Sequence, residues 1–404
     1  MNKKGLSKVM VGFVLVLGVL ALVFGPVSAA EKKEPIKIGI VLPFSGGLEL
    51  FGQQGTQGAK MAVAEINAAG GVLGGRPFEL IIEDDKTDPK TAVEKVTKLV
   101  MKDKVHAILG PITSANRDAM TPLVTKLKTP LLYATDYEGG VCNRYVFCYS
   151  AVPDHYIKPF IPYLMKNYGD SFYLFGADYV WPHGMNAAIN AAITANKGKV
   201  VAEEYTPFGV KDFASTIQKI GASGAKVLIL TLPGADGQTF VKQFGEFGMK
   251  DKVKIAFMGF NDNYMSGLTG QQAEGVITCN HFIQSLDRPD AKDFVARQHK
   301  MFGDKAIVSF YADSHYGIVM LFKQAIEKAK SDNKEKIIDA MPGLSVTAAN
   351  GKVTMHEDHH MTLNMLIAEV MGGQLKMKEY IGPIRAADQC AGKKMGGAKE
   401  TTKK

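Results

Sequence analysis

The 404-residue sequence lacks the motifs by which the commoner enzyme classes are recognised. No Gly-x-Ser-x-Gly motif places a serine nucleophile on a sharp turn after a strand. Residues 70–75 are rich in glycine, but they follow a helical pattern rather than a strand, so we interpret them as a turn and not as a phosphate-binding loop. Residues 356–360 include three histidines, but consecutive side chains cannot all reach one metal ion. We therefore expect no catalytic residue, no metal site and no cofactor.

Long apolar segments are absent after residue 30, so no later segment is expected to cross a membrane. Before that point the chain has three lysines within its first eight residues, an apolar run over residues 9–24 and the small residues Val27–Ala30. This order is typical of an export signal that is cleaved after its small residues. The apolar run is shorter than the roughly 20 residues that a membrane span needs. We therefore predict a signal peptide over residues 1–30 and a protein secreted into the periplasm.

Net positive charge is nearly absent from the body of the chain, although the formal net charge of the whole chain is +8. Residues 1–30 contribute +3 and residues 392–404 contribute +4, which leaves a net charge of +1 for the residues between them. A nearly neutral body lacks the basic surface that binds DNA or RNA, so we expect no nucleic-acid partner. The segment 392–404 is rich in Lys, Gly and Thr, which predicts a disordered basic tail.

Cysteine is rare, and the four in the chain are Cys142, Cys148, Cys279 and Cys390. An even number in a chain marked for an oxidising compartment favours disulfide bonds. Cys142 and Cys148 enclose a short loop that is poor in other metal-binding side chains, and we predict that they are bonded to each other. Whether Cys279 and Cys390 also pair is left open, because connectivity cannot be deduced from sequence.

What the chain does have is a regular alternation of short strand patterns and helical patterns. The predicted strands cover residues 36–42, 78–82, 107–110 and 131–133, and then, after Val152-Pro153, residues 172–175, 200–205, 227–231 and 255–258. The predicted helices cover residues 55–69, 90–101, 213–220, 239–247, 291–301 and 314–329, with further helices after residues 110 and 184. Short strands are also expected near residue 353 and over 363–370. Such alternation predicts parallel strands joined by right-handed crossovers.

The two series of strands predict an α/β fold with two doubly wound parallel-sheet lobes. A chain of 404 residues also exceeds what one hydrophobic core usually serves. We assign residues 34–152 and 281–355 to the first lobe, and residues 153–280 and 356–385 to the second lobe.

Ligands of open parallel sheets bind beyond the carboxyl ends of the strands, where loops and helix starts converge. One such loop places Thr113 and Ser114 at the start of a predicted helix. A helix start presents unpaired backbone N–H groups, which a side-chain hydroxyl can cap or a ligand can occupy. A cap and a ligand contact are therefore both open interpretations of these two hydroxyls.

Three further strand-end loops carry polar and aromatic side chains. Residues 133–139 are dense in hydrogen-bonding groups, and residues 176–182 hold the only tryptophan, Trp181. Residues 233–236 follow a strand in the second series and end at an aspartate. The aromatic residues in these loops are either core residues or ligand contacts.

Several segments together form a recognisable set, although each is weak alone. They are Ile38-Gly39-Ile40 with Pro43-Phe44-Ser45-Gly46, Gly70-Gly71 to Gly74-Gly75-Arg76, Glu83-Asp84-Asp85 with Asp88-Pro89, and Val105 to Gly110. Through them the chain resembles, over nearly its whole mature length, the type I periplasmic binding proteins of the hydrophobic amino-acid and amide uptake family. The segments most similar to the branch that binds short amides and urea are Tyr137-Glu138-Gly139, Asp178–Pro182, and Asn350-Gly351 with His359-His360.

The resemblance also points to ligand-binding residues. Together with the loops described above, it gives as candidates Ser114, Thr113, Tyr133, Thr135, Tyr179, Trp181 and Asp236. Receptors for α-amino acids usually hold the ammonium group with an acidic residue in the loop that is occupied here by residues 233–236. Because Asp236 lies one or two positions late, an amino-acid ligand is less expected than an amide.

The function implied by the resemblance is that of the substrate-binding protein of an ABC importer. Two lobes joined by a three-strand hinge would close over a small-molecule ligand without catalysis, and a membrane permease and ATPase complex would then accept it. The protein is expected to be a monomer. The alternatives are an extracytoplasmic ligand sensor that feeds a signalling receptor and, with less support, an amide-acting enzyme. The ligand itself, whether amide, urea, amino acid or small aromatic acid, is not fixed by the sequence.

Overall fold

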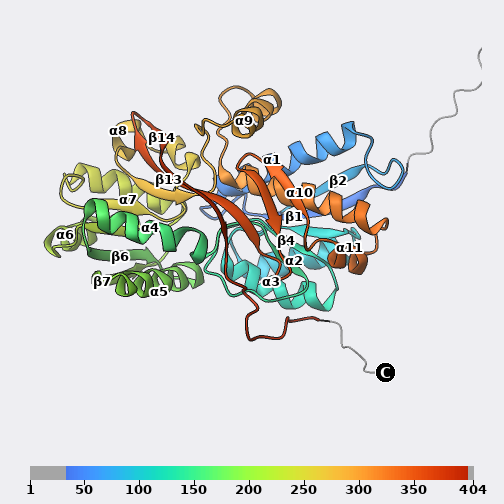
Figure 1. The fold of residues 1–404 in the computed structure, drawn as a ribbon, viewed down its shortest axis with the longest axis horizontal. Helices are drawn as coiled ribbons and strands as arrows, with labels where there is room; N and C mark the ends of the chain where they lie inside the picture. The colour runs from blue at the N-terminus through green and yellow to red at the C-terminus, as the bar shows by residue number, and fades with distance from the viewer. Residues whose placement is uncertain (1–32, 399–404) are drawn as a thin grey trace, which may run out of the picture. The chain divides into compact units, whose positions relative to one another are not determined.

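The structure is a computed structural model that describes residues 33–398 of the chain (Figure 1). The predicted signal peptide and the last six residues of the predicted tail lie outside the described residues. The described residues from Pro35 onward form one compact unit, and the description below concerns this unit.

The first sheet has five parallel strands in the order β2-β1-β3-β4-β5. These strands are β1 (Ile36–Leu42), β2 (Phe78–Asp84), β3 (Ala107–Leu109), β4 (Leu131–Tyr133) and β5 (Val146–Cys148). The helices that follow the first three strands are α1 (Glu49–Ala68), α2 (Pro89–Met101) and α3 (Ser114–Lys126). The central strands β3 and β4 are buried along their whole length, as expected for a parallel sheet covered on both faces.

The second sheet repeats this arrangement. Its parallel strands lie in the order β7-β6-β8-β9-β10, which is the strand order of the first sheet. They are β6 (Ser171–Ala177), β7 (Lys199–Thr206), β8 (Val227–Thr231), β9 (Lys254–Phe257) and β10 (Ile277–Asn280). The accompanying helices are α4 (Pro153–Tyr168), α5 (Val180–Ala195), α6 (Ala214–Ala222), α7 (Gly234–Glu246), the 3-10 helix η1 (Asp262–Ser266) and α8 (Gly270–Ala273). The predicted α/β fold with parallel-sheet lobes is confirmed.

The C-terminal elements return to both sheets. The helices are α9 (Pro289–Phe302), α10 (Phe310–Ala329) and α11 (Lys334–Ala340), and the strands are β11 (Ser345–Ala348), β12 (Gly351–Met355), β13 (Met361–Met371) and β14 (Gln374–Arg385). Helix α10 packs against α1 beside the first sheet (Figure 1). Strand β13 pairs antiparallel with β10 of the second sheet, with β12 and with β14. The chain therefore passes between the two sheets after β5 and again after β10, and strands β11 to β14 extend the second sheet beyond β10.

Two segments predicted as loops are helix starts. Helix α5 begins at Val180, so Trp181 and Pro182 lie in its first turn. Proline is tolerated there because the first-turn N–H groups have no intrahelical partner. Helix α7 begins at Gly234, so Asp236 also lies in a first turn rather than in a loop.

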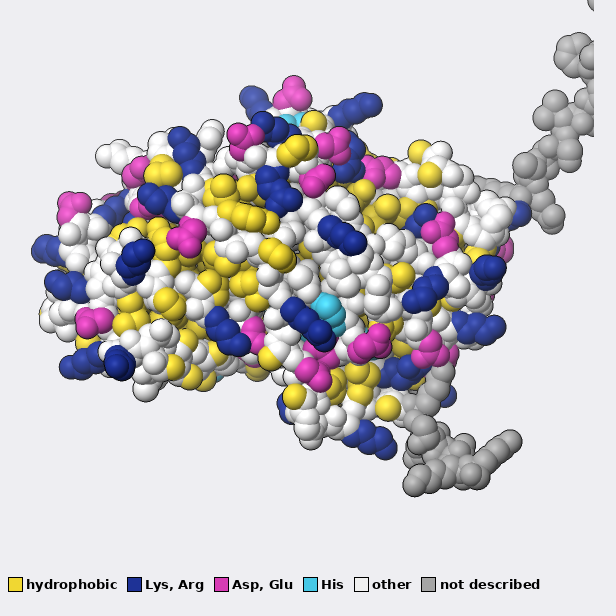
Figure 2. Space-filling view, in the orientation of Figure 1, with side chains coloured by type: hydrophobic (Ala, Val, Ile, Leu, Met, Phe, Trp, Pro, Cys, Tyr) yellow, Lys and Arg dark blue, Asp and Glu magenta, His cyan; other side chains and the backbone are white. Residues whose placement is uncertain are grey.

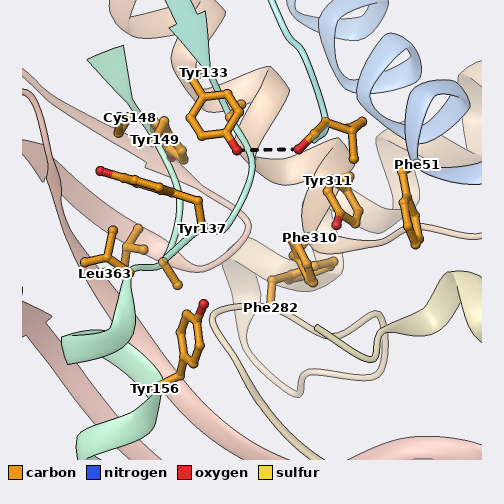
Figure 3. Packing of buried hydrophobic residues seen from close by; sticks show 14 of the residues in the cluster. Phe51, Tyr133, Tyr137, Cys148, Tyr149, Tyr156, Phe282, Phe310, Tyr311 and Leu363 are labelled. Atoms are coloured by element: carbon orange, nitrogen blue, oxygen red, sulfur yellow. Dashed lines mark hydrogen bonds between the residues drawn. The ribbon is translucent and has the colours of Figure 1, made fainter. Parts of the chain in front are cut away.

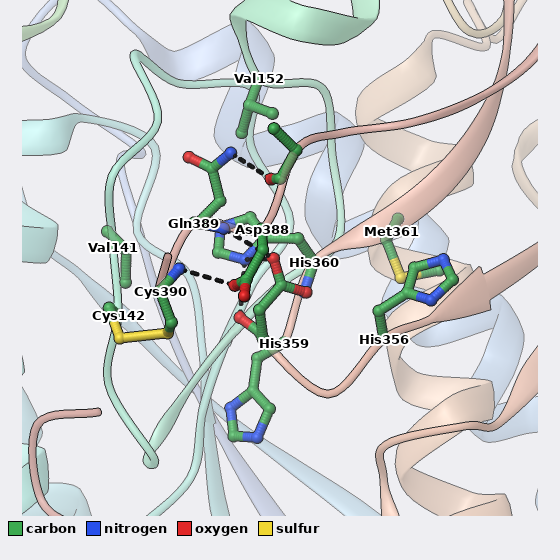
Figure 4. Close-up of polar contacts among 12 residues, drawn as sticks. Val141, Cys142, Val152, His356, His359, His360, Met361, Asp388, Gln389 and Cys390 are labelled. Atoms are coloured by element: carbon green, nitrogen blue, oxygen red, sulfur yellow. Dashed lines mark hydrogen bonds and ion pairs between the residues drawn. A yellow bond between two sulfur atoms is a disulfide. The ribbon is translucent and has the colours of Figure 1, made fainter. Parts of the chain in front are cut away.

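The cysteine pairing differs from the prediction. Cys142 is bonded to Cys390, which lies 248 residues away, and the prediction of a Cys142–Cys148 bond is wrong (Figure 4). Cys148 lies in β5, where the sheet buries its side chain completely, whereas Cys142 lies in the preceding loop beside the C-terminal segment. Cys279 is likewise a buried free thiol, in β10.

The C-terminal segment is ordered over part of its length. The Gly396 N–H donates to the Cys142 carbonyl at 3.0 Å, and the Arg144 N–H donates to the Gly396 carbonyl at 2.8 Å. The Gln389 side-chain oxygen accepts from the Gly140 N–H at 2.7 Å, and the Gln389 N–H donates to the Asp358 carboxylate at 2.9 Å. These contacts place part of the C-terminal segment against the loop before β5, and the disorder expected for residues 392–404 stays a prediction.

Candidate functional site

A small cavity, partly open to solvent, lies where the strand-end loops of the two sheets meet, and about 30 Å³ of it is accessible to a water molecule. Its lining residues are Leu48, Phe51, Ile112, Ser114, Thr135, Asp136, Tyr179, Trp181, Pro233, Met258, Gly259, Tyr264 and Tyr311. A second hollow, lined by residues 47–51, Gly234, Ala235, Gln238, Asn263 and Tyr264, shares Leu48, Phe51 and Tyr264 with it. Because three wall residues are common to both, we treat the second hollow as the mouth of the cavity.

The hydroxyl groups of the first lobe are positioned by the start of α3. Thr113 is the N-cap residue, and its hydroxyl accepts from the Asn116 N–H at 3.2 Å. Ser114 lines the cavity and donates its hydroxyl to the Glu138 carboxylate at 2.6 Å. Thr135, which follows β4, also lines the cavity and donates to the Pro111 carbonyl at 3.2 Å. The cap interpretation thus describes Thr113, while Ser114 and Thr135 border the cavity.

A buried ion pair supports this corner of the cavity. The Arg117 guanidinium pairs with Glu138 at 2.6 Å and with Asp118 at 2.9 Å. It also lies over the rings of Tyr137 and Tyr133, at 4.6 and 5.3 Å from their centroids. Burial by itself would lower the pKa of Arg117, but the neighbouring acidic groups raise it overall. Arg117 is therefore a charged residue whose partners are already within the protein.

Aromatic side chains form most of the remaining wall. We use the name aromatic wall for Phe51, Tyr179, Trp181, Tyr264 and Tyr311, all of which line the cavity. The rings of Phe51 and Tyr311 are stacked with centroids 4.8 Å apart, and both are labelled in Figure 3. Tyr179 and Trp181 lie 6.5 Å apart at the start of α5. Among the described residues, the buried Trp181 Nε1 has no hydrogen-bond partner.

The carboxyl group of Asp136 lies inside this wall. Burial raises its pKa to about 7, and the charge of Glu138 acts in the same direction, while a hydrogen bond from Tyr311 opposes the rise. The lining residues of the cavity and of its mouth include Asp136 and Glu49 but no Lys, Arg or His. The site is therefore apolar, aromatic and acidic.

Four of the predicted ligand-binding residues line the cavity, and three do not. Those in the lining are Ser114, Thr135, Tyr179 and Trp181. Tyr133 is fully buried behind the cavity, with its hydroxyl 3.4 Å from the Ile112 carbonyl (Figure 3). Asp236 accepts a hydrogen bond from the Gly209 N–H at 2.7 Å, and Thr113 is the helix cap described above.

Sequence reasoning missed Asp136, Phe51, Tyr264 and Tyr311. Asp136 directly follows Thr135 in a loop dense in hydrogen-bonding groups, so the position of Thr135 was a usable signal. Tyr264 comes from a 3-10 helix and Tyr311 from the first turn of α10, far along the chain from the strand-end loops that carry the predicted contacts. The segment directly before Tyr311 follows helix α9 rather than a strand, so the strand-end rule gives no signal at this residue.

The exterior fits the expectation from charge. On the face shown in Figure 2, basic and acidic side chains are interspersed rather than gathered by sign. Within residues 33–398, no helix combines the length and apolar character that crossing a membrane requires. The same residues contain no group of three or more His, Cys, Asp or Glu side chains placed to hold a metal ion.

Two parallel-sheet lobes with a cavity walled by both define a two-lobed binding protein. Residues 35–374 match the family described as periplasmic binding protein, and the chain belongs to this family. The resemblance to type I periplasmic binding proteins is thereby confirmed at the level of the family. Membership of a binding-protein family also agrees with the expectation that the chain is not an enzyme.

Individual relatives cover most of the chain. The Leu/Ile/Val-binding protein homolog 6 of Brucella melitensis is 25% identical over 356 residues, which are 86% of this chain and 90% of the relative. A solute-binding protein of an ABC transporter from R. palustris, solved with 4-hydroxybenzoate, is 25% identical with a TM-score of 0.76, covering 88% of this chain and 98% of that one. The branched-chain amino acid binding protein LivJ of Streptococcus pneumoniae, solved with isoleucine, is 23% identical with a TM-score of 0.78, covering 87% and 100%.

Proposed function

We propose that this protein is the extracytoplasmic substrate-binding protein of an ABC importer and that it binds one small solute without transforming it. The observation that carries the proposal is the cavity, whose lining comes from strand-end loops of both sheets. A cavity walled by two lobes opens and closes as the lobes move about their connections, which is the hinge closure of periplasmic binding proteins. The family match supports the same role.

The moving bodies in this proposal are residues 34–152 with 281–355 and residues 153–280 with 356–385. The packing of α10 against α1 supports the assignment of residues 310–329 to the first body. The pairing of β13 with β10 supports the assignment of residues 361–371 to the second.

In the closed protein we expect Ser114 and Thr135 to contact the solute from the first lobe, and Tyr179 and Trp181 to contact it from the second. Closure removes water from the solute, so each buried polar group of the solute needs a partner in the protein. Tyr133 lies beneath this surface and takes part through the packing of its ring against Arg117.

The identity of the solute is the finer part of the proposal. The segment Tyr137-Glu138-Gly139 supports a short amide or urea, whereas the name of the Brucella relative supports branched-chain amino acids. The two solved structures named above hold an aromatic acid and an amino acid. These ligands share a small size and a hydrogen-bonding end, so we propose a small polar solute of that kind.

The setting in the cell completes the proposal. We infer export through residues 1–30, a location in the periplasm, a monomeric state, and release of the solute to a membrane permease and ATPase complex. The pattern of lysines, apolar run and small residues at the start of the chain supports export. Intact mass of the protein from the periplasmic fraction tests this inference, and retention of residues 1–29 would contradict it.

A ligand screen by thermal shift tests the binding function. The panel contains short amides, urea, branched-chain amino acids and benzoates, and each positive solute is then titrated by calorimetry. A solute at 100 times its Kd should add about 2.7 kcal/mol to the free energy of unfolding. Mass spectrometry of the solute after prolonged incubation should find it unchanged. Conversion of the solute to a product, with turnover, would contradict the proposal.

A further inference from the structure

The position of Asp136 bears on the charge of the solute, within the binding function proposed above. The residue is 9% exposed and lines the cavity. A buried carboxylate without a positive partner is costly, because the protein interior does not replace its hydration. None of the residues that line the cavity or its mouth is a Lys, Arg or His, so the described wall offers Asp136 no cation.

The buried cation beside Ser114 already has partners within the protein. Arg117 pairs with Glu138 and Asp118, and its Nη1 also donates to the Ser114 hydroxyl at 3.2 Å. The Glu138 carboxylate in turn lies at the start of α3, where it accepts from Ser114. A solute carboxylate placed at this helix start would meet the negative charge of Glu138. The start of α3 could attract an anion, but the Glu138 carboxylate of the protein already occupies that position.

The aromatic wall favours the opposite charge. The faces of tyrosine and tryptophan rings attract cations through their quadrupole, most strongly where water is excluded. Tyr179, Trp181, Tyr264 and Tyr311 line the same cavity as Asp136. The unpartnered Nε1–H of Trp181 would be satisfied by an acceptor oxygen on the solute.

We propose that the solute of this cavity is a small organic cation, an amine or amidine without a carboxylate group, with its charged nitrogen against Asp136 inside the aromatic wall. This inference rests on the proposed binding function and names its substrate class. It sets the cavity apart from those of the structural neighbours that were solved with 4-hydroxybenzoate and isoleucine.

The test uses two sets of probes that have nearly the same shape and differ in charge. They are benzylamine, benzamide and benzoate, and ethanolamine, acetamide and acetate, with urea, benzamidine, glycinamide and isoleucine as further probes. Calorimetric titration of the full mature chain at pH 8 should show binding of amines or amidines, and binding of their neutral and anionic counterparts at least thirtyfold weaker.

Two isosteric variants locate the charge recognition. Asp136→Asn should weaken binding of the cation at least thirtyfold, because it removes the buried partner charge while keeping the shape. Asp262→Asn is the matched control: Asp262 is equally exposed, accepts from the Gln284 N–H at 3.1 Å, and is absent from the cavity lining. The control variant should bind the cation within about threefold of the parent, and the melting curves of both variants should show a folded protein.

The pH dependence gives an independent reading. With a pKa of about 7, the ionised fraction of Asp136 falls about tenfold from pH 8 to pH 6, so affinity for the cation should fall by the same factor as the pH is lowered. The other groups that face Asp136 are Glu138, Tyr156, Tyr179, Tyr264, Cys279, His281 and Tyr311. Burial lowers the pKa of His281 to about 3 and raises the pKa values of the tyrosines and of Cys279. His281, the tyrosines and Cys279 therefore do not titrate between pH 6 and 8. The pH dependence should disappear in Asp136→Asn.

The outcomes separate the two proposals. Binding of benzoate, isoleucine or acetamide in preference to every amine and amidine overturns the inference about charge and leaves the binding function standing. Equal cation affinity in Asp136→Asn and the parent overturns it as well. If none of the ten probes binds, the inference fails for cations of this size, and the function is then judged by the broader thermal-shift screen.

Discussion

At the scale of single residues, polar side chains near the cavity divide into those that hold the protein together and those that face the cavity. Thr113 caps α3, and Asp236 fixes the loop at Gly209 through its carboxylate. Tyr179 plays neither role, because it is half-buried at the start of α5 and its ring contacts Phe208 with centroids 5.1 Å apart. A side chain that lines a cavity without a structural hydrogen bond is available to a solute.

Replacement of Tyr179 by Ala should therefore weaken solute binding much more than it weakens folding. Loss of an aromatic contact that becomes fully desolvated on binding costs about 2 kcal/mol, or about thirtyfold in affinity. Calorimetric titration and a melting curve on the variant measure the two effects. Tyr173→Ala is the control, because Tyr173 is a core residue of β6 and its truncation should cost about 3 to 5 kcal/mol of stability. An unchanged affinity with a collapsed melting temperature in Tyr179→Ala would assign Tyr179 to the core.

The sequence located the cavity-lining loops better than it located the individual contacts. Thr135 lies in a strand-end loop, and Ser114 and Tyr179 lie at the helix starts that follow such loops, which topology alone directs to one edge of a parallel sheet. The direction in which each side chain points depends on the residue at which the following helix begins. Helix propensities locate that residue only to within a few positions. Asp236 shows the effect, since a helix that begins at Gly234 turns its carboxylate toward Gly209 and out of the cavity lining.

At the scale of elements, the first turns of α5 approach the loop after β4 closely. A Cβ atom added at Gly184 would lie 2.6 Å from the Cβ atom of Glu138, which belongs to that loop. Real Cβ atoms do not come that close, so glycine at this position is what lets α5 approach the Glu138 loop. The contact is with the stem of a side chain whose carboxylate is fixed by Arg117 and Ser114, so it has little room to give way.

Replacement of Gly184 by Ala should weaken solute binding about tenfold while the free protein melts at an unchanged or higher temperature. Overpacking of a close contact costs about 1 to 3 kcal/mol, and because Gly184 and Glu138 belong to different lobes of the proposed division, we expect that cost to fall on the closed arrangement. In the open protein, Ala in a helix is more stable than Gly by about 0.5 to 1 kcal/mol. Titration with any solute found in the screen, together with a melting curve of the free variant, measures both effects.

Gly245→Ala is the matched control for this helix substitution. The Cβ atom added at Gly245 would meet only the far end of the Lys250 side chain, at 3.0 Å from its Cε atom, and a flexible side chain can move aside. The Gly245→Ala variant should bind the solute with the affinity of the parent protein. Equal affinity in Gly184→Ala would show that the contact with Glu138 does not govern closure.

Strand and helix alternation was predictable because each strand carries a buried apolar run between polar turns. Helix α4 was missed for a physical reason: Pro159 and Pro162 lie inside it, and proline in a helix interior removes a hydrogen bond that propensity rules count. Strands β5 and β10 were missed because they break the alternation: β5 follows β4 with no helix between them, and β10 follows only the four-residue helix α8.

At the scale of the whole molecule, the Cys142–Cys390 bond ties the C-terminal segment to the loop before β5. The loop that it closes spans 248 residues, for which the loop-entropy relation gives a stabilisation of up to about 5 kcal/mol. Sequence rules favoured the near neighbour Cys148 because they count separation along the chain. The fold decides otherwise, since the complete burial of Cys148 in β5 withdraws its thiol from the surface.

Reduction of this bond should lower the melting temperature of the parent by several degrees. Cys390→Ser should melt at the lowered temperature and be insensitive to reductant, because it already lacks the bond. Cys279→Ser keeps the bond and should retain the difference between reduced and oxidised samples, whatever its own effect on packing. Peptide mapping without reductant should find the peptides of Cys142 and Cys390 joined. A joined pair of Cys142 and Cys148 would refute the assignment.

The distance of this bond along the chain also sets an order of events during synthesis. In a chain that emerges across a membrane from its N-terminus, Cys142 arrives with Cys148 six residues behind it, and Cys390 follows only when almost the whole chain has crossed. A pairing of the first two thiols is the accessible early product, and it must be avoided or undone. The first sheet accomplishes this if β5 docks before an oxidant acts, because Cys148 is then out of reach. The Cys142–Cys390 bond can therefore form only after the C-terminal segment that carries Cys390 has been synthesised and exported.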